Sequence, residues 1–107
     1  MPRASSRIVA ALLVVVAPIG VVVGDPTAGA ETAQTCLGCH GVEGYRNTYP
    51  SYHVPKIGGQ SAAYLEEALV AYREGRRDHP TMSAQAGRIS EEDIRNVAAF
   101  FAGEEQP

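Results

Sequence analysis

The stretch Cys36-Leu37-Gly38-Cys39-His40-Gly41 decides how the rest of the sequence is interpreted. It holds the only two cysteines of the 107-residue chain, three positions apart, and a histidine directly after the second. A single pair so close in sequence closes a very small loop, so it cannot cross-link a small fold in the way that several disulfides do. We therefore interpret these residues as a chemical site.

The order Cys-x-x-Cys-His matches the attachment sequence of c-type haem, in which each thiol adds to a vinyl group and the histidine reaches the iron. About one helical turn between Cys36 and Cys39 lets both sulfur atoms reach one edge of the ring, while His40 turns towards its centre. A structural disulfide would stabilise little. A thioredoxin-like pair needs strands that the sequence lacks, and a zinc site would need His53 and His79 without a paired spacing. The sequence favours covalent haem.

The N-terminal residues have the pattern of an export signal. Arg3 and Arg7 precede an apolar run over residues 8–23, interrupted only by a proline and a glycine, which is the order of a secretory signal peptide. Cleavage after Gly24 is predicted. The alternatives are cleavage after Ala30, which ends an Ala-x-Ala pattern, and an uncleaved anchor, although the run is shorter than the roughly 20 residues that span a bilayer. The sequence therefore predicts a signal over residues 1–24, a domain over 25–107 and a periplasmic location.

The expected mature domain is small and acidic. Removing residues 1–24, with two arginines and no acidic residue, leaves 83 residues and changes the net charge from −3 to −5. This charge excludes the basic surface that binds nucleic acid. A domain of this size buries only about 60% of the surface of its unfolded chain and usually needs a disulfide, a metal or a cofactor. A covalently attached haem would meet that need.

Apolar periodicity predicts helices and no strands. A short helix-compatible segment over residues 28–34 leads into the cysteines. Ser61 is expected to cap a helix that runs to about Glu74 before a glycine. Ser90 is expected to cap a last helix with three acidic residues in its first turn, ended by Gly103. The sequence thus predicts an all-α fold of three to four short helices wrapped around one haem.

Two segments between these helices are expected to be irregular. Residues 41–59 contain several glycines and prolines, and residues 76–87 are polar, with a proline and a glycine. Arg73, Arg76 and Arg77, which are interleaved with acidic residues, are interpreted as a solvated face. A loop as long as the first is uncommon in a compact domain unless it wraps something.

Six pieces of sequence, in this order, resemble the class I c-type cytochromes. They are Gly29, the Cys36 to Gly41 motif, Pro55-Lys-Ile-Gly-Gly-Gln60, Ala63-Tyr-Leu, His79-Pro-Thr-Met82, and Ser90-Glu-Glu-Asp-Ile followed by Ala98-Ala-Phe-Phe. The resemblance covers nearly all of the expected mature sequence. It looks closest to the short bacterial domains of di-haem periplasmic cytochromes c and of the haem subunits of flavocytochrome c sulfide dehydrogenases. It implies the class I cytochrome c fold.

The resemblance also implies further site residues. Met82 corresponds to the methionine that supplies the second axial ligand of the iron, with His79 as the rival. Pro55 corresponds to the proline whose carbonyl accepts the other ring N–H of the haem histidine. Gly29 and Phe100 correspond to the pair at which the first and last helices cross, where a glycine admits an aromatic ring.

Ligation by His40 and Met82 would fill both axial positions, which favours electron transfer over catalysis. The expected function is a periplasmic mono-haem electron carrier, not an enzyme, that docks transiently with a donor and an acceptor protein as a monomer. One alternative is a haem subunit of a dehydrogenase, for example one that oxidises a sulfur compound. The other is a ligand-binding sensor or a peroxidase, which requires that Met82 does not ligate the iron.

Overall fold

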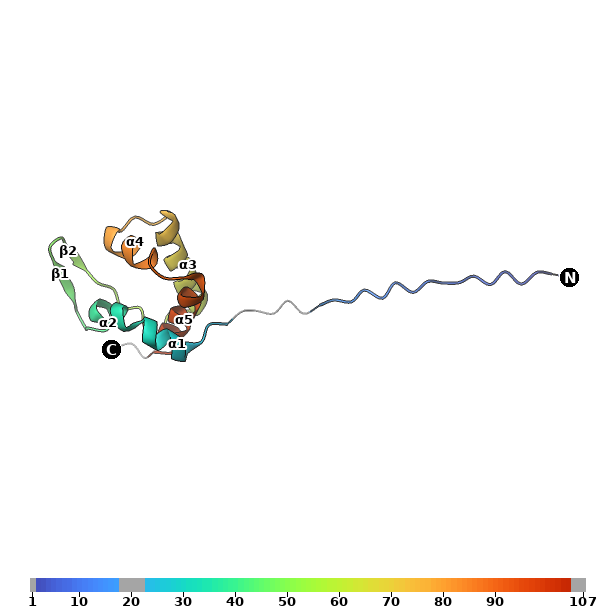
Figure 1. Cartoon of the computed structure of the whole chain (residues 1–107), viewed down its shortest axis with the longest axis horizontal. Helices are drawn as coiled ribbons and strands as arrows, with labels where there is room; N and C mark the ends of the chain where they lie inside the picture. Colours follow the sequence, from blue (N-terminus) through green and yellow to red (C-terminus); the bar gives the residue numbers. More distant parts are fainter. Residues whose placement is uncertain (1, 18–22, 105–107) are drawn as a thin grey trace.

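The computed structural model describes residues 2–17 and 23–104. Residues 2–17 have no regular secondary structure and extend away from a helical body, as Figure 1 shows. The proline and glycine that interrupt the expected signal sequence, Pro18 and Gly20, lie outside the described residues. Within the two described ranges, no helix has the length and apolar character needed to cross a membrane.

The helical body contains five helices and one hairpin within residues 23–104. The helices are α1 (Pro26–Thr32), α2 (Gln34–His40), α3 (Ala62–Glu74), α4 (Pro80–Ala86) and α5 (Glu91–Ala102); the antiparallel strands are β1 (Arg46–Thr48) and β2 (Ser51–His53). The predicted fold class is confirmed, because the structure is mostly helical with little strand. The predicted number of helices was too low by at least one.

The ends of the two long helices are where the sequence placed them. The Ser61 hydroxyl accepts a hydrogen bond from the backbone N–H of Tyr64, and the Ser90 hydroxyl accepts one from Asp93. Each bond satisfies one of the N–H groups that a helix leaves unpaired at its start. Gly75 ends α3 in the left-handed region, with φ of 78°, a conformation that costs glycine little.

The two regions predicted to be irregular both contain regular structure, and here the predictions were wrong. Part of residues 41–59 forms the β1–β2 hairpin, in which Asn47 donates its side-chain N–H to the Pro50 carbonyl at 2.6 Å. Part of residues 76–87 forms α4, because the ring of His79 caps the helix and Pro80 occupies its first turn. Proline is favourable at that position, since its missing N–H has no intrahelical partner there.

The crossing of α1 and α5 forms the base of the fold. Gly29 is buried in α1, and a Cβ atom at this position would overlap the backbone carbonyl of Asn96 in α5. The backbone N–H of Asp25 also donates to the Asn96 side-chain oxygen at 2.8 Å. The close approach at Gly29 was predicted correctly, but its nearest neighbours are the backbone atoms of Asn96 and Val97 rather than the ring of Phe100.

Gly29→Ala is expected to destabilise the haem-loaded protein by about 3 kcal/mol, at the upper end of the usual range for overpacking. Two backbones meet at Gly29, so no side-chain rotation can relieve the overlap. Gly38 in α2 is the matched control, because a Cβ there meets nothing within 4 Å. Gly38→Ala is expected to raise stability slightly through helix propensity. Thermal unfolding of both variants measures the difference, and equal midpoints would contradict the proposed close crossing.

Candidate haem site

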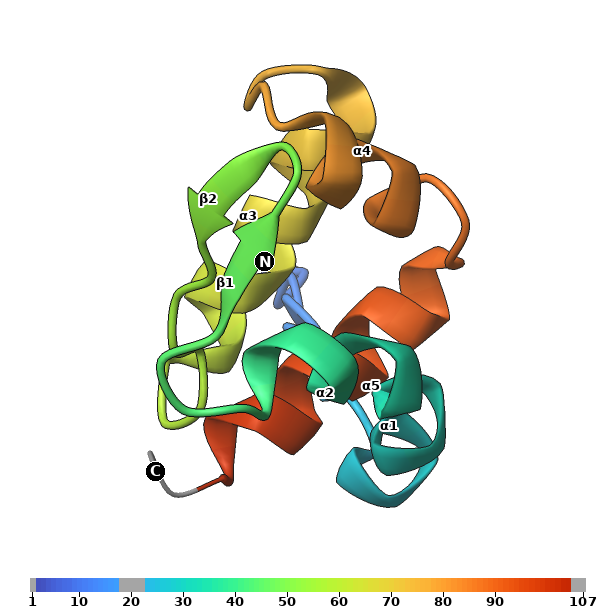
Figure 2. The same ribbon diagram turned by 90° about the vertical axis from the view of Figure 1, so that its left-hand side faces the viewer.

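A cavity of about 440 Å³ opens between α2, the hairpin, α3 and α4. Its volume lies in the range of typical cofactor sites, roughly 300–1,000 Å³. Figure 2 shows the hairpin beside α4, with α2 below both. The residues predicted for the site line this one cavity: Cys36, Cys39, His40, Pro55 and Met82. Apolar side chains from α3, including Leu65, Ala68 and Leu69, form much of the remaining wall.

Helix α2 presents Cys36, Cys39 and His40 to the cavity. It follows α1 after a break at Ala33, whose carbonyl accepts hydrogen bonds from the N–H groups of Cys36 at 2.9 Å and Leu37 at 2.9 Å. Both cysteines are free thiols and half-buried. Burial raises the pKa of the Cys36 thiol above its ordinary value, more than a hydrogen bond with Thr35 lowers it. The cavity therefore disfavours the charged thiolate form of Cys36. A thioether bond between this sulfur and a haem vinyl group is uncharged, so it suits the same environment.

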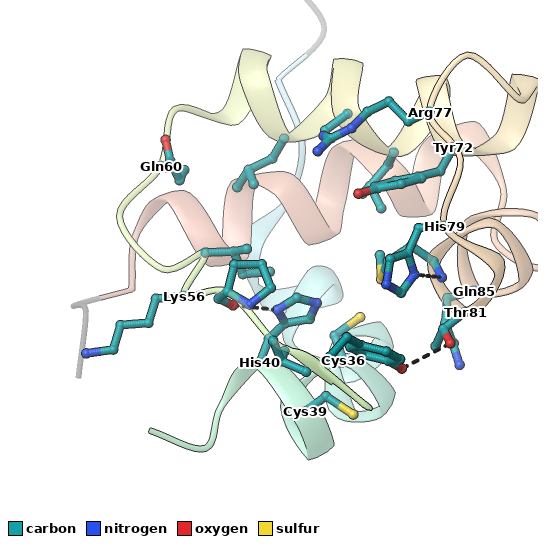
Figure 3. Close-up of a pocket in the computed structure, with 18 of the residues that line it drawn as sticks. Cys36, Cys39, His40, Lys56, Gln60, Tyr72, Arg77, His79, Thr81 and Gln85 are labelled. Atoms are coloured by element: carbon teal, nitrogen blue, oxygen red, sulfur yellow. Dashed lines mark hydrogen bonds between the residues drawn. The ribbon is translucent and has the colours of Figure 1, made fainter. Parts of the chain in front are cut away.

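The hydrogen bond of His40 fixes the proton on its ring. Nδ1 lies 2.8 Å from the Pro55 carbonyl oxygen, and a carbonyl can only accept, so Nδ1 carries the hydrogen. In the neutral ring Nε2 is then left with a free lone pair, as a metal ligand requires. Figure 3 shows His40 and both cysteines on one side of the cavity, with Tyr72 and Arg77 on the other.

His79 has the opposite arrangement. Its Nδ1 accepts the backbone N–H of Met82 at 3.3 Å, so in the neutral ring the hydrogen lies on Nε2. That nitrogen then has no lone pair to offer a metal. The His79 ring also packs edge to face against two tyrosines, with ring centroids 4.8 Å from Tyr52 and 6.5 Å from Tyr72. His79 therefore caps α4 and packs against aromatic rings, and its ring offers no free nitrogen lone pair in this arrangement.

Sequence reasoning missed the roles of two arginines, Arg77 in the wall of the cavity and Arg73 at α4. The interpretation of three arginines as one solvated face holds for Arg76 and Arg77, which are both exposed, but not for Arg73, which is half-buried. Arg76 pairs with Glu67 and Glu74. Arg77 lies over the Tyr72 ring, 4.6 Å from its centroid, and lines the cavity. Arg73 donates to the backbone carbonyls of Ala86 and Ile89 at the end of α4. Its position four residues after Leu69, on the inner face of α3, was the signal that was overlooked.

Arg73→Ala is expected to lower the free energy of unfolding by about 2 kcal/mol, because two carbonyls at the end of α4 lose a charged donor. Thermal unfolding of the haem-loaded protein measures this, with a fall in Tm of about 4–8 °C per kcal/mol for a domain of this size. Arg76→Ala is the control, and its exposed ion pairs are expected to leave the midpoint nearly unchanged. A similar Tm for both variants would mean that Arg73 does not hold α4 in place.

Comparison of the sequence with known proteins identifies a family for this chain. Residues 24–101 match the family model described as cytochrome C oxidase, cbb3-type, subunit III. Cytochrome c-554(548) of Halomonas halodenitrificans is 40% identical over 85 residues, which cover 77% of this chain and 99% of that protein. The cytochrome subunit of sulfide dehydrogenase of Chlorobaculum tepidum is 33% identical over 67 residues, covering 63% of this chain and 57% of that protein.

A solved cytochrome structure has a similar fold. The crystal structure of reduced recombinant cytochrome c4 from Pseudomonas stutzeri has a TM-score of 0.57 and 27% sequence identity, covering 80% of this chain and 53% of that chain. This chain therefore spans little more than half of that structure and of the sulfide dehydrogenase subunit. The chain belongs to the class I c-type cytochromes, electron-transfer proteins whose cofactor is a covalently attached haem c, and Cys36 and Cys39 have the spacing of its two attachment points.

Proposed function

We propose that this chain is a periplasmic mono-haem cytochrome that transfers single electrons between redox partner proteins through an iron held by His40 and Met82. The observation that carries the proposal is the pair of opposite hydrogen-bond partners at Nδ1 of His40, a carbonyl oxygen, and at Nδ1 of His79, a backbone N–H. The Pro55 carbonyl leaves Nε2 of His40 free to bind a metal, while the N–H of Met82 occupies Nδ1 of His79 and leaves Nε2 protonated. Of the two candidates for the second ligand, Met82 lines the cavity and would need no shift of a ring proton to offer its thioether sulfur.

The residues around the site support binding of a ring and exclusion of water. Bound in this cavity, haem supplies a one-electron couple between two oxidation states of iron. Apolar side chains in the cavity wall would cover the apolar faces of the haem ring; they include Leu65, Leu69 and Ile57. The Pro55 carbonyl keeps His40 in one orientation. If His40 and Met82 both held the iron, an outside molecule such as oxygen would have to displace one of them. This favours an electron carrier over a sensor or a peroxidase.

The proposed domain limits follow from α1. Cleavage after Ala30 would remove most of this helix, including Gly29 and the Asp25 backbone N–H that bonds to Asn96. Cleavage after Gly24 would retain Gly29, and the Asp25 nitrogen, then the N-terminal ammonium group, could still donate to Asn96. We therefore propose residues 1–24 as the export signal and residues 25–107 as the mature domain, consistent with the proposed periplasmic location.

A second candidate function is that of a haem subunit within a dehydrogenase complex. The similarity to the cytochrome subunit of sulfide dehydrogenase favours this alternative. Copurification with a larger catalytic chain from the native host would support it, whereas elution as a lone domain of the mature mass would support the free carrier.

An optical spectrum of the purified exported protein tests the proposal. The oxidised form is expected to show the weak far-red band typical of methionine–iron ligation in this family. The reduced form is expected not to bind carbon monoxide under native conditions, because the sixth position is filled. Absence of the band together with rapid carbon monoxide binding would overturn the assignment of Met82 and support the sensor or peroxidase.

A further inference from the structure

One short segment, residues 52–55, contacts both sides of the haem site; we name it the strap. It comprises the end of β2 and the two residues that follow. At one end, the Pro55 carbonyl accepts the hydrogen bond of His40. At the other, the Tyr52 hydroxyl donates to the Thr81 hydroxyl oxygen on α4 at 3.0 Å. Figure 3 marks the bonds at His40 and Thr81 with dashed lines.

Tyr52 contacts the start of α4 at two points. Besides its bond to Thr81, its ring meets the His79 ring edge to face, with an interplanar angle of 84°. His79 caps α4 by accepting the N–H of Met82, and Thr81 directly precedes Met82. Tyr52 therefore touches the residues that determine where Met82 lies, from a strand 29 positions away in sequence.

Helix α4 depends on such contacts. It has only seven residues and a single buried one, Ala86, and a helix so short is not stable without tertiary packing. Arg73 holds its C-terminal end through the Ala86 and Ile89 carbonyls. The N-terminal end, which carries Met82, is held by His79 and by the bond between Tyr52 and Thr81.

We infer that Tyr52 is a positioning residue that holds the Met82 end of α4 against the haem and so disfavours replacement of Met82 by an outside ligand. The strap thereby couples the two axial sides of the site, because the residues that support His40 and Met82 lie three positions apart on one segment. This inference rests on the proposed function, in which Met82 ligates the iron.

Imidazole binding to the oxidised, haem-loaded protein tests the inference. Tyr52→Phe removes only the hydroxyl and is expected to lower the Kd for imidazole about fivefold, the factor that corresponds to one hydrogen bond of ordinary net strength. Thr81→Val removes the same bond from the other side and is expected to have a similar effect. The double variant should bind no more tightly than either single variant, because the two substitutions share one interaction.

Two controls separate positioning from a general loss of stability. Tyr49→Phe makes the same chemical change on the same hairpin at a side chain that is 94% exposed, and should leave the Kd unchanged. Ser90→Ala removes the cap of α5, which lies beyond the C-terminal end of α4 and not at its Met82 end, and should lower Tm without changing the Kd.

The outcomes distinguish the inference from the proposed function. If the wild-type protein shows the far-red band but Tyr52→Phe and Thr81→Val bind imidazole as it does, the strap does not position Met82 and the inference is overturned. The same conclusion follows if Ser90→Ala changes the Kd as much as they do. If the wild-type protein lacks the band and binds imidazole as tightly as Met82→Ala, the proposed function fails, and the inference fails with it.

Discussion

A chain in which Cys36 and Cys39 are both replaced by serine is expected to be exported as bare polypeptide and to lose its cooperative fold. Serine keeps the size and the hydrogen-bonding capacity of the thiol but does not form the thioether to a vinyl group. Intact mass of the mature protein from a haem-competent host should therefore lack the added tetrapyrrole. Far-UV circular dichroism should show that most helix is lost.

The expected loss of the fold follows from the small core. The buried apolar side chains within the described residues are few, and the core around α5 is built from Ala33, Leu65, Val97, Ala98 and Phe101. Side chains of α2, α3 and α4 form the walls of the haem cavity. Without the ring, these walls would face water, and a domain of this size has little other stability to compensate.

Single substitutions and a neighbouring control sharpen this prediction. Cys36→Ser and Cys39→Ser each leave one thiol, so each should retain one thioether and a partly stabilised fold. Gly38→Ala lies between the cysteines, meets no other atom within 4 Å, and should mature normally. A double serine variant that is cooperatively folded and free of haem would show that the domain does not depend on its cofactor.

The sequence predicted best those features that depend on neighbouring residues. The Cys-x-x-Cys-His motif and the caps at Ser61, Gly75 and Ser90 each act within one helical turn, so their chemistry is visible in a few letters. The hairpin was missed because strands of three residues are too short to show alternation. Helix α4 was missed because a cap at His79 followed by Pro80 looks like a turn, and seven residues are too few for clear periodicity.

In the candidate site, too, local features could be predicted from the sequence and contacts between distant residues could not. The cysteines and His40 were predicted from spacing, and Pro55 and Met82 from the family resemblance; all five line one cavity. Tyr52 and Thr81 meet across 29 positions, and no periodic pattern or local motif links two residues that far apart. The difference in ring tautomer between His40 and His79 was equally invisible, because each is set by a backbone group that only the folded chain brings near.

Met82→Leu is expected to abolish the far-red band, to let the reduced protein bind carbon monoxide and to lower the reduction potential by more than about 60 mV, a tenfold change in equilibrium constant for one electron. Leucine has nearly the volume of methionine, so the fold should survive with less than about 1.5 kcal/mol lost. It has no sulfur lone pair, however. The thioether is a soft ligand that raises the potential of haem iron, and its loss removes that effect.

His79→Asn is the matched variant for the rival ligand. Asparagine can cap α4 by accepting the Met82 N–H in place of the imidazole, so the helix should keep its start and Met82 its position. The band and the closed sixth position are expected to persist. If His79→Asn instead opened the iron to carbon monoxide while Met82→Leu left the spectrum intact, His79 would be the ligand. The hydrogen bond at its Nδ1 would then have to break in the haem-loaded protein, because only a ring with the proton moved to Nδ1 could bind the iron through Nε2.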